Sequence, residues 1–66
     1  MRLTQREEEV LAQLVAGLTN REIAQELGIS ARTVETHRGR VMHKMGCRRL
    51  ADLVRKVVSG LHHEIA

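Results

Sequence analysis

The 66-residue sequence contains no proline and no aromatic residue, and its only cysteine is Cys47. A chain without proline or aromatic residues, in which Leu, Ala, Arg and Glu are plentiful, favours helices and offers little material for β-strands. Because one cysteine cannot form an internal disulfide, so small a chain depends on packing or on a partner for stability. The missing rings also argue against single-stranded nucleic acid as a ligand, since its bases are usually stacked on aromatic side chains.

Long apolar runs and catalytic motifs are missing as well. No apolar run approaches the roughly 18 residues that a membrane span needs, and no signal-peptide pattern precedes the first predicted helix. We therefore expect a cytoplasmic protein that does not contact a membrane. Neither a glycine-rich phosphate loop nor paired carboxylates outside helix starts are present, so we expect no enzyme activity and no cofactor. His43 and Cys47 lack the paired spacing of a zinc site, so we expect no metal.

The charge of the chain is distributed unevenly. Residues 1–30 carry three basic and five acidic side chains, whereas residues 31–56 carry eight basic and two acidic ones. A concentration of positive charge in one part of a small domain is typical of polyanion binding. On charge alone, a solvated basic helix face remains an equal alternative. Duplex DNA is read through phosphates and base edges without aromatic stacking, so double-stranded DNA is the expected partner.

Capping patterns divide the chain into four predicted helices, at about residues 5–16, 20–27, 31–45 and 48–59. Thr4 with Glu7, and Thr19 with Glu22, have the spacing of a capping box, and Ser30 can cap the third helix. The predicted helices end at glycines: Gly17, Gly28, Gly46 and Gly60. These signals predict an all-α, four-helix bundle-like domain over residues 1–66, with an ordered core at about 3–60 and a frayed tail at 61–66.

The second and third predicted helices, with residues 28–30 between them, have the pattern of a helix-turn-helix. Ala24 is small enough for two helices to approach closely, and Gly28 can adopt the left-handed conformation of a tight turn. Val34 can then anchor the next helix against Ala24 and Leu27. A plain three-helix core can share any one of these residues, but all three together with correct caps indicate a DNA-binding motif.

The helical period separates residues 31–45 into two faces. With Val34 taken as the inward direction, Val41 and Met45 fall within about 20° of it, and His37 and Arg38 lie on the shoulders. The opposite face has no large apolar residue and suits a major groove. It consists of Arg32, Thr33, Glu35, Thr36, Gly39, Arg40 and His43.

Two residues of this outer face have two interpretations each. Glu35 can accept a hydrogen bond from a cytosine amino group or orient an arginine, or it is simply a solvated glutamate. Gly39 costs roughly 1 kcal/mol in a helix relative to alanine. The helix tolerates that cost if its backbone lies close to the groove, or the position makes no base contact.

The fourth predicted helix is apolar on more than one side, which is too broad for a single core contact. One part of this stripe can pack inward while another meets a second copy of the chain; alternatively, the whole stripe belongs to the core. Symmetric pairing would predict a DNA site with inverted half-sites about one helical turn apart. The residues of the stripe are Leu50, Leu53, Val54, Val57, Val58 and Leu61.

Over residues 3–58 the sequence resembles the LuxR-type DNA-binding domain of bacterial regulators. The matching stretches are LTQREEEVLAQLVAGLTNREIAQELGIS, ARTVETHRGRVMHKMG and RRLADLV. The string RTVETHRGRVMHKM is most similar to the FixJ/NarL response-regulator branch. The resemblance implies sequence-specific DNA binding as the effector module of a bacterial transcription regulator in a two-component system. It places helix 31–45 in the major groove and lets helix 48–59 pair two protomers, at least on DNA, with RNA polymerase as a further candidate partner.

Candidate contact residues follow from the outer face and the resemblance together. The predicted base-facing residues are Glu35, Thr36, Gly39, Arg40 and His43. The predicted phosphate-contacting residues are Asn20, Arg21, Arg32, Thr33, His37 and Lys44. The predicted dimer interface consists of Leu53, Val54, Val57 and Val58. Gly39 departs from the many family members that carry a polar or basic side chain at that position.

Two alternatives remain open from the sequence. The promoter-recognition region of a sigma factor resembles this chain up to about Lys44, although the valine-rich fourth helix argues against it. A protein-interaction module could keep the same fold without touching DNA, although the strongly basic stretch 31–56 argues against that. The salt dependence of duplex binding would distinguish the second alternative.

Overall fold

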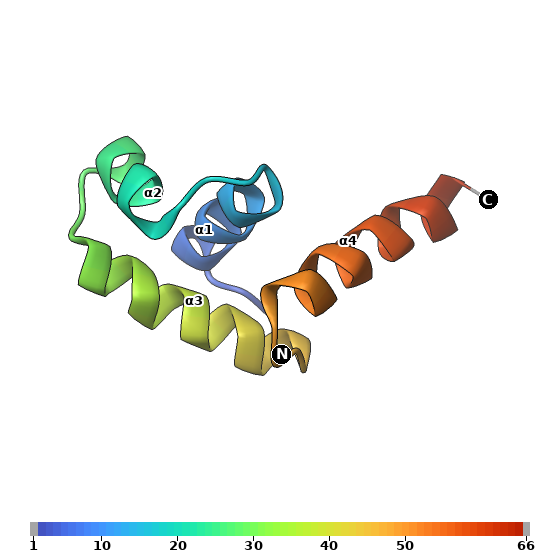
Figure 1. The fold of residues 1–66 in the computed structure, drawn as a ribbon. Helices are drawn as coiled ribbons and strands as arrows, with labels where there is room; N and C mark the ends of the chain where they lie inside the picture. The colour runs from blue at the N-terminus through green and yellow to red at the C-terminus, as the bar shows by residue number, and fades with distance from the viewer. Residues whose placement is uncertain (1, 66) are drawn as a thin grey trace.

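The computed structural model describes the backbone of residues 2–65 and the side chains of residues 2–60 (Figure 1). Within that part of the chain it contains α1 (Gln5–Val15), α2 (Asn20–Leu27), α3 (Ala31–Met45) and α4 (Leu50–Ile65), and no β-strand. The predicted all-α fold with four helices is confirmed. None of these helices combines the length and the apolar character needed to cross a membrane.

The helix bounds agree with the prediction to within one residue except in α4. The bounds of α2 and α3 are as predicted, and α1 ends one residue early, whereas α4 begins at Leu50 and continues to Ile65. The predicted end at Ser59 was wrong because Gly60 does not take the positive φ found at Gly17, Gly28 and Gly46. A helical glycine costs about 1 kcal/mol but keeps its backbone hydrogen bond, and no proline follows. The predicted frayed tail includes Ala66 and the side chains of 61–66, which lie outside the described residues, so the domain limits stay a prediction.

The predicted caps are present at the first three helices. Thr4 Oγ1 accepts a hydrogen bond from the Glu7 amide at 3.1 Å, and Glu7 Oε1 accepts one from the Thr4 amide at 2.9 Å. Thr19 and Glu22 form the same pair at 3.2 and 2.9 Å. Ser30 Oγ accepts from the Thr33 amide at 3.1 Å. Side chains therefore satisfy amides at these helix starts that have no partner within the helix.

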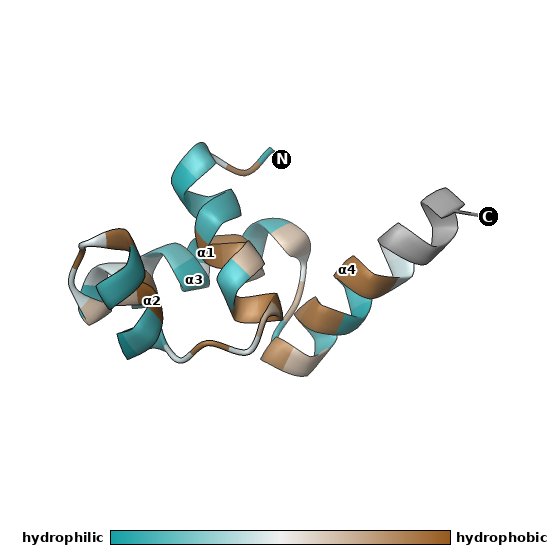
Figure 2. Cartoon of the chain, turned by 90° about the horizontal axis from the view of Figure 1, so that it is seen from above, coloured by the Kyte–Doolittle hydropathy of each residue, from teal (hydrophilic) through white to brown (hydrophobic). Residues whose placement is uncertain are grey.

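One hydrophobic core joins all four helices. The buried apolar residues are Val10, Leu14, Ile23, Ala24, Val34, Val41 and Leu53. Helices α1, α2 and α3 form the body of the molecule, and α4 packs its N-terminal part against α1 and α3 before projecting away (Figure 1). Hydrophobic positions recur along this projecting helix (Figure 2). The chain is consequently elongated, with extents of 38 × 21 × 20 Å.

The turn between α2 and α3 has the predicted helix-turn-helix form. Gly28 adopts φ 68° and ψ 34°, in the left-handed region, and the Ile29 amide donates to the Ala24 carbonyl at 3.0 Å. Ala24 and Val34 both lie in the core on either side of this turn. A side chain at residue 28 would be strained in that conformation, so glycine is needed here for the angle at which α3 leaves α2.

Candidate nucleic-acid interface

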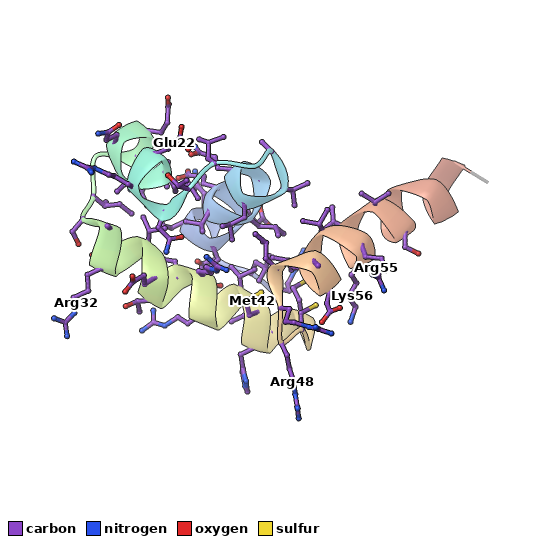
Figure 3. The ribbon with its side chains drawn as sticks, viewed as in Figure 1. Glu22, Arg32, Met42, Arg48, Arg55 and Lys56 are labelled. Atoms are coloured by element: carbon purple, nitrogen blue, oxygen red, sulfur yellow. The ribbon has the colours of Figure 1, made fainter. Side chains whose placement is uncertain are left out.

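The outer face of α3 is exposed along its whole length. Val34 and Val41 are fully buried and Met45 is half-buried, whereas every residue assigned to the opposite face is exposed. Figure 3 shows the Arg32 side chain extending from the start of α3 away from the rest of the molecule. The predicted division of this helix into a core face and an outer face is therefore confirmed.

Thr36 presents a defined set of groups on this face. Its hydroxyl donates to the Arg32 carbonyl one turn earlier, at 3.2 Å. Because the hydroxyl proton is used within the helix, Thr36 offers outward an oxygen that accepts hydrogen bonds and a methyl group. Such a pair fits the amino groups and the thymine methyl that a major groove displays.

A shallow hollow runs beside α3 and collects residues from three helices. It brings the predicted base-facing Glu35 and Gly39 together with Asn20, the first residue of α2. Asn20 Oδ1 accepts from Arg38 Nη1 at 3.5 Å, which links α2 to α3. The remaining lining residues are Met42, Arg48, Arg49 and Leu50. Arg48 and Arg49 were not among the contacts predicted from the sequence, although their place in the basic stretch 31–56 was a signal for them.

Gly39 leaves open space on the outer face. A Cβ placed on this residue would meet no atom within 4 Å, and its φ is not in the left-handed region. No packing among the described residues therefore requires glycine at this position. The reason for a glycine here has to lie outside the protomer or in the absence of any contact.

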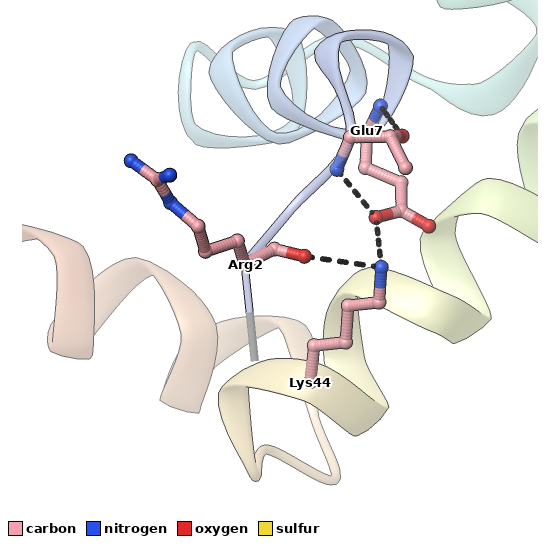
Figure 4. A network of polar contacts seen from close by, with 4 residues as sticks. Arg2, Glu7 and Lys44 are labelled. Carbon is pink, nitrogen blue, oxygen red and sulfur yellow. Dashed lines mark hydrogen bonds and ion pairs between the residues drawn. The ribbon is translucent and has the colours of Figure 1, made fainter.

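Lys44 lies in a different environment from the other phosphate candidates. Its Nζ donates to Glu7 Oε1 at 2.6 Å and to the Arg2 carbonyl at 3.2 Å (Figure 4). The Lys44 side chain is 21% exposed and that of Glu7 only 2%. The hydrogen bond from Lys44, followed by that from the Thr4 amide, lowers the pKa of Glu7 below its usual 4.5. Two of the three Nζ donors of Lys44 are engaged within the fold, so its predicted phosphate contact has one donor left.

The other predicted phosphate contacts differ in exposure. Arg21, Arg32 and Thr33 are exposed. His37 is half-buried, and its Nδ1 atom is buried without a hydrogen-bond partner among the described residues, so a phosphate contact by this residue has to use Nε2. These assignments stay predictions.

The predicted dimer residues of α4 do not share one environment. Leu53 has no exposed surface and belongs to the core of the protomer, so its assignment to a dimer interface needs correction. Val54 and Val57 are half-buried, and Val58 is 53% exposed. Of the four predicted dimer residues, these three valines are the ones that α4 leaves at least partly open to a partner.

The part of the chain that the structure describes contains no group of three or more His, Cys, Asp or Glu side chains that could hold a metal ion. Cys47 is half-buried, and its Sγ donates to the Met45 carbonyl at 3.5 Å.

Comparison with known proteins identifies the family of this chain. The family described as bacterial regulatory proteins, luxR family, matches residues 1–57. The transcriptional regulatory protein TdiR of Thauera aromatica is 49% identical over 61 residues, which are 92% of this chain and 27% of TdiR. The transcriptional regulatory protein FixJ of Rhizobium meliloti (strain 1021) is 52% identical over 58 residues, or 88% of this chain and 28% of FixJ. Neither of these relatives supports the sigma-factor or interaction-module alternative.

A solved structure shows the same fold. The response regulator StyR matches with a TM-score of 0.84 and 47% sequence identity, over 86% of this chain and 29% of that protein. The chain spans between a quarter and a third of the length of these relatives. On the match over residues 1–57 and on these relatives, the chain belongs to the LuxR family of bacterial regulatory proteins, as a helix-turn-helix domain of the kind found in FixJ-like response regulators.

Proposed function

We propose that this chain binds double-stranded DNA sequence-specifically through α3, as the effector module of a bacterial transcription regulator. The observation that carries the proposal is the outer face of α3, which is polar and fully exposed and which follows a capped helix-turn-helix. With 15 residues, α3 is about 22 Å long. A helix of this size enters a major groove about 12 Å wide with its N-terminal part over the base edges.

Different parts of the interface have different tasks. Thr36 and Glu35 accept hydrogen bonds from base amino groups, and the arginines at positions 32 and 40 supply charge for phosphates or for guanine. Asn20 and Arg21 at the start of α2 contact the backbone and fix the register of α3. This arrangement separates sequence reading on α3 from positioning on its flanks.

A twofold pairing of two chains through α4 is part of the proposal. The half-buried Val54 and Val57 and the exposed Val58 would meet their equivalents in a second copy, at least on DNA. Such pairing gives an operator with inverted half-sites about one turn apart. We also propose that the regulator acts in the cytoplasm and that RNA polymerase is a further partner.

Selection of bound sequences from a random duplex pool, at about 0.15 M salt, tests the function directly. Enrichment of an inverted repeat supports specific binding by a symmetric dimer. Enrichment of a single half-site supports sequence-specific binding by α3 without dimerisation through α4. A folded helical chain that enriches no sequence would refute the proposed function.

Thr36→Ala tests the reading face within the same selection. Because this exposed hydroxyl bonds only to its own helix among described residues, the variant should fold normally. We expect it to lose preference at one base position, by about 1–3 kcal/mol if the contact is direct. Gln5→Ala, at an exposed position of α1, serves as the control and should enrich the same DNA sequence as the wild-type protein. An unchanged preference in Thr36→Ala would remove this residue from the reading face.

A further inference from the structure

A second open hollow lies where α3 turns into α4, and it is strongly basic. Its charged lining residues are Arg48, Arg49, Asp52, Arg55 and Lys56. Four cations thus face a single carboxylate across one shallow cleft, which we call the α3–α4 cleft. An arrangement of this kind attracts an anionic partner, because neighbouring like charges cost free energy unless a counter-charge lies between them.

Two of the four cations are already used within the fold. Lys56 Nζ donates to the Met45 carbonyl at 2.7 Å and so binds the negative end of the α3 dipole. Arg49 Nε lies 3.7 Å from Asp52 Oδ2, in a pair that is exposed to solvent. No hydrogen bond or ion pair joins the side chain of Arg48 or Arg55 to another described residue, and both residues are exposed. Arg48 and Arg55 are therefore the groups available to a ligand.

The α3–α4 cleft is continuous with the recognition surface. Arg48 and Arg49 line this cleft and also line the hollow that contains Glu35 and Gly39. Figure 3 shows Arg48 extending to the same side of the molecule as Arg32, and Arg55 and Lys56 further along on α4. A ligand that lies along the outer face of α3 and extends past its C-terminal end would meet the cleft next.

We propose that the α3–α4 cleft binds backbone phosphates of the DNA immediately beside the bases that α3 reads, with Arg48 and Arg55 as the contacting residues. The inference rests on the proposed function. Duplex DNA fits better than an acidic protein segment because one continuous polyanion can occupy the outer face and the cleft together. The cleft has no large apolar side chain in its lining, which suits phosphates and gives a protein partner little to bury.

The test compares Arg48→Ala, Arg55→Ala and the double variant with the wild-type chain. Affinity for the selected duplex is measured by fluorescence anisotropy over a range of salt concentrations. Each arginine that touches a phosphate should contribute about one unit to the slope of log Kobs against log salt. At about 0.15 M salt this corresponds to about a fivefold loss of affinity for each variant. The selected sequence should not change, because phosphate contacts carry no base information.

Arg6→Ala is the matched control, since it also removes one exposed positive charge. Arg6 lies on α1, paired with Glu9 at 3.1 Å, and lines neither hollow. The slope of log Kobs against log salt for Arg6→Ala should equal that of the wild type. Thermal melting by circular dichroism checks that all variants remain folded.

Ethylation of single phosphates should interfere with wild-type binding next to the half-site, and this interference should disappear in the double variant.

The inference and the proposed function can fail separately. If the wild type enriches a sequence while the double variant keeps its salt slope and ethylation pattern, the cleft does not contact DNA and the inference is overturned. An acidic protein would then be the partner that fits the cleft. If the wild type enriches no sequence, the proposed function fails. In that case, the salt dependence of binding to random-sequence duplex still tests the cleft. A shallower slope of log Kobs against log salt in the variants than in the wild type would support the cleft as a phosphate site by itself.

Discussion

At the scale of single residues, Gly39 is the position where a small change is most informative. It lies in the middle of α3, with helical backbone and free space where a Cβ would be. We expect Gly39→Ala to raise the free energy of unfolding by about 1 kcal/mol and the melting temperature by about 4–8 °C. Thermal and urea unfolding followed by circular dichroism measure both. A loss of stability would contradict the open environment of this residue.

The DNA affinity of Gly39→Ala decides between the two interpretations of this glycine. If the α3 backbone lies against the groove at this point, the added methyl group lowers affinity for the selected duplex despite the gain in stability. If residue 39 makes no contact, affinity stays unchanged. Melting and binding are measured on the same sample, so a folding effect cannot be mistaken for a binding effect.

The environment of Glu7 leads us to expect that the stability of the fold depends on pH. The Lys44 and Thr4 hydrogen bonds lower the folded-state pKa of Glu7 below the usual 4.5. Its carboxylate therefore stabilises the fold above about pH 4.5, and this contribution is lost as the pH falls through the lower folded value. Glu22 acts in the same direction, because the Thr19 amide and hydroxyl lower its pKa.

We expect the free energy of unfolding, measured by urea titration between about pH 7 and pH 3, to decrease below about pH 4.5. Glu7→Gln should be less stable at neutral pH and should lose less stability on acidification. Glu8→Gln is the control, because Glu8 is exposed and lies on the same helix. A Glu7→Gln variant with the full acid sensitivity of the wild type would show that this carboxylate is not responsible.

At the scale of helices, α4 is the element through which we propose that two chains pair. Val58→Glu should leave the protomer folded, since this side chain is already 53% exposed. It should abolish cooperative binding to paired half-sites while single half-sites are still bound, because a buried carboxylate would be desolvated across the pairing surface. Gel-shift titrations on one and two half-sites measure this difference.

Ala12→Glu adds the same charge at an exposed position of α1 and is the control for the effect of charge alone. It should keep cooperative binding. If Val58→Glu also binds paired half-sites normally, α4 is not the pairing surface, and the three exposed or half-buried valines need another explanation.

The helices themselves could be predicted largely from local signals. The bounds of α2 and α3 follow from capping residues and glycines a few positions apart, which act within one turn of helix. Gly60 carries the same local signal but continues the helix, because a glycine permits a left-handed cap without requiring one. The sequence also placed Leu53 on the pairing surface. The angle at which α4 meets α1 and α3 decides which side of the helix is buried, and periodicity alone does not give that angle.

At the scale of the whole molecule, the least predictable features join residues far apart in the chain. Lys44 and Glu7 are separated by 37 positions, and only the packing of α1 against α3 brings them to 2.6 Å. From its position in the motif alone, Lys44 was predicted to contact phosphate. The outer face of α3 could be predicted because one helix determines it. The two hollows could not, because each requires the relative placement of two or more helices.

The shared core has a consequence for how the domain responds to its ligand. All four helices contribute to one cluster of buried side chains, so the recognition helix exists only while the whole fold is intact. By thermodynamic linkage, operator DNA then acts as a folding ligand. Free duplex at 100 times Kd adds about 2.7 kcal/mol to the free energy of unfolding, which raises the melting temperature of a domain this small by roughly 10–20 °C. A core substitution such as Val34→Ala would, by the same linkage, lower operator occupancy without touching DNA, because it lowers the fraction of folded chains.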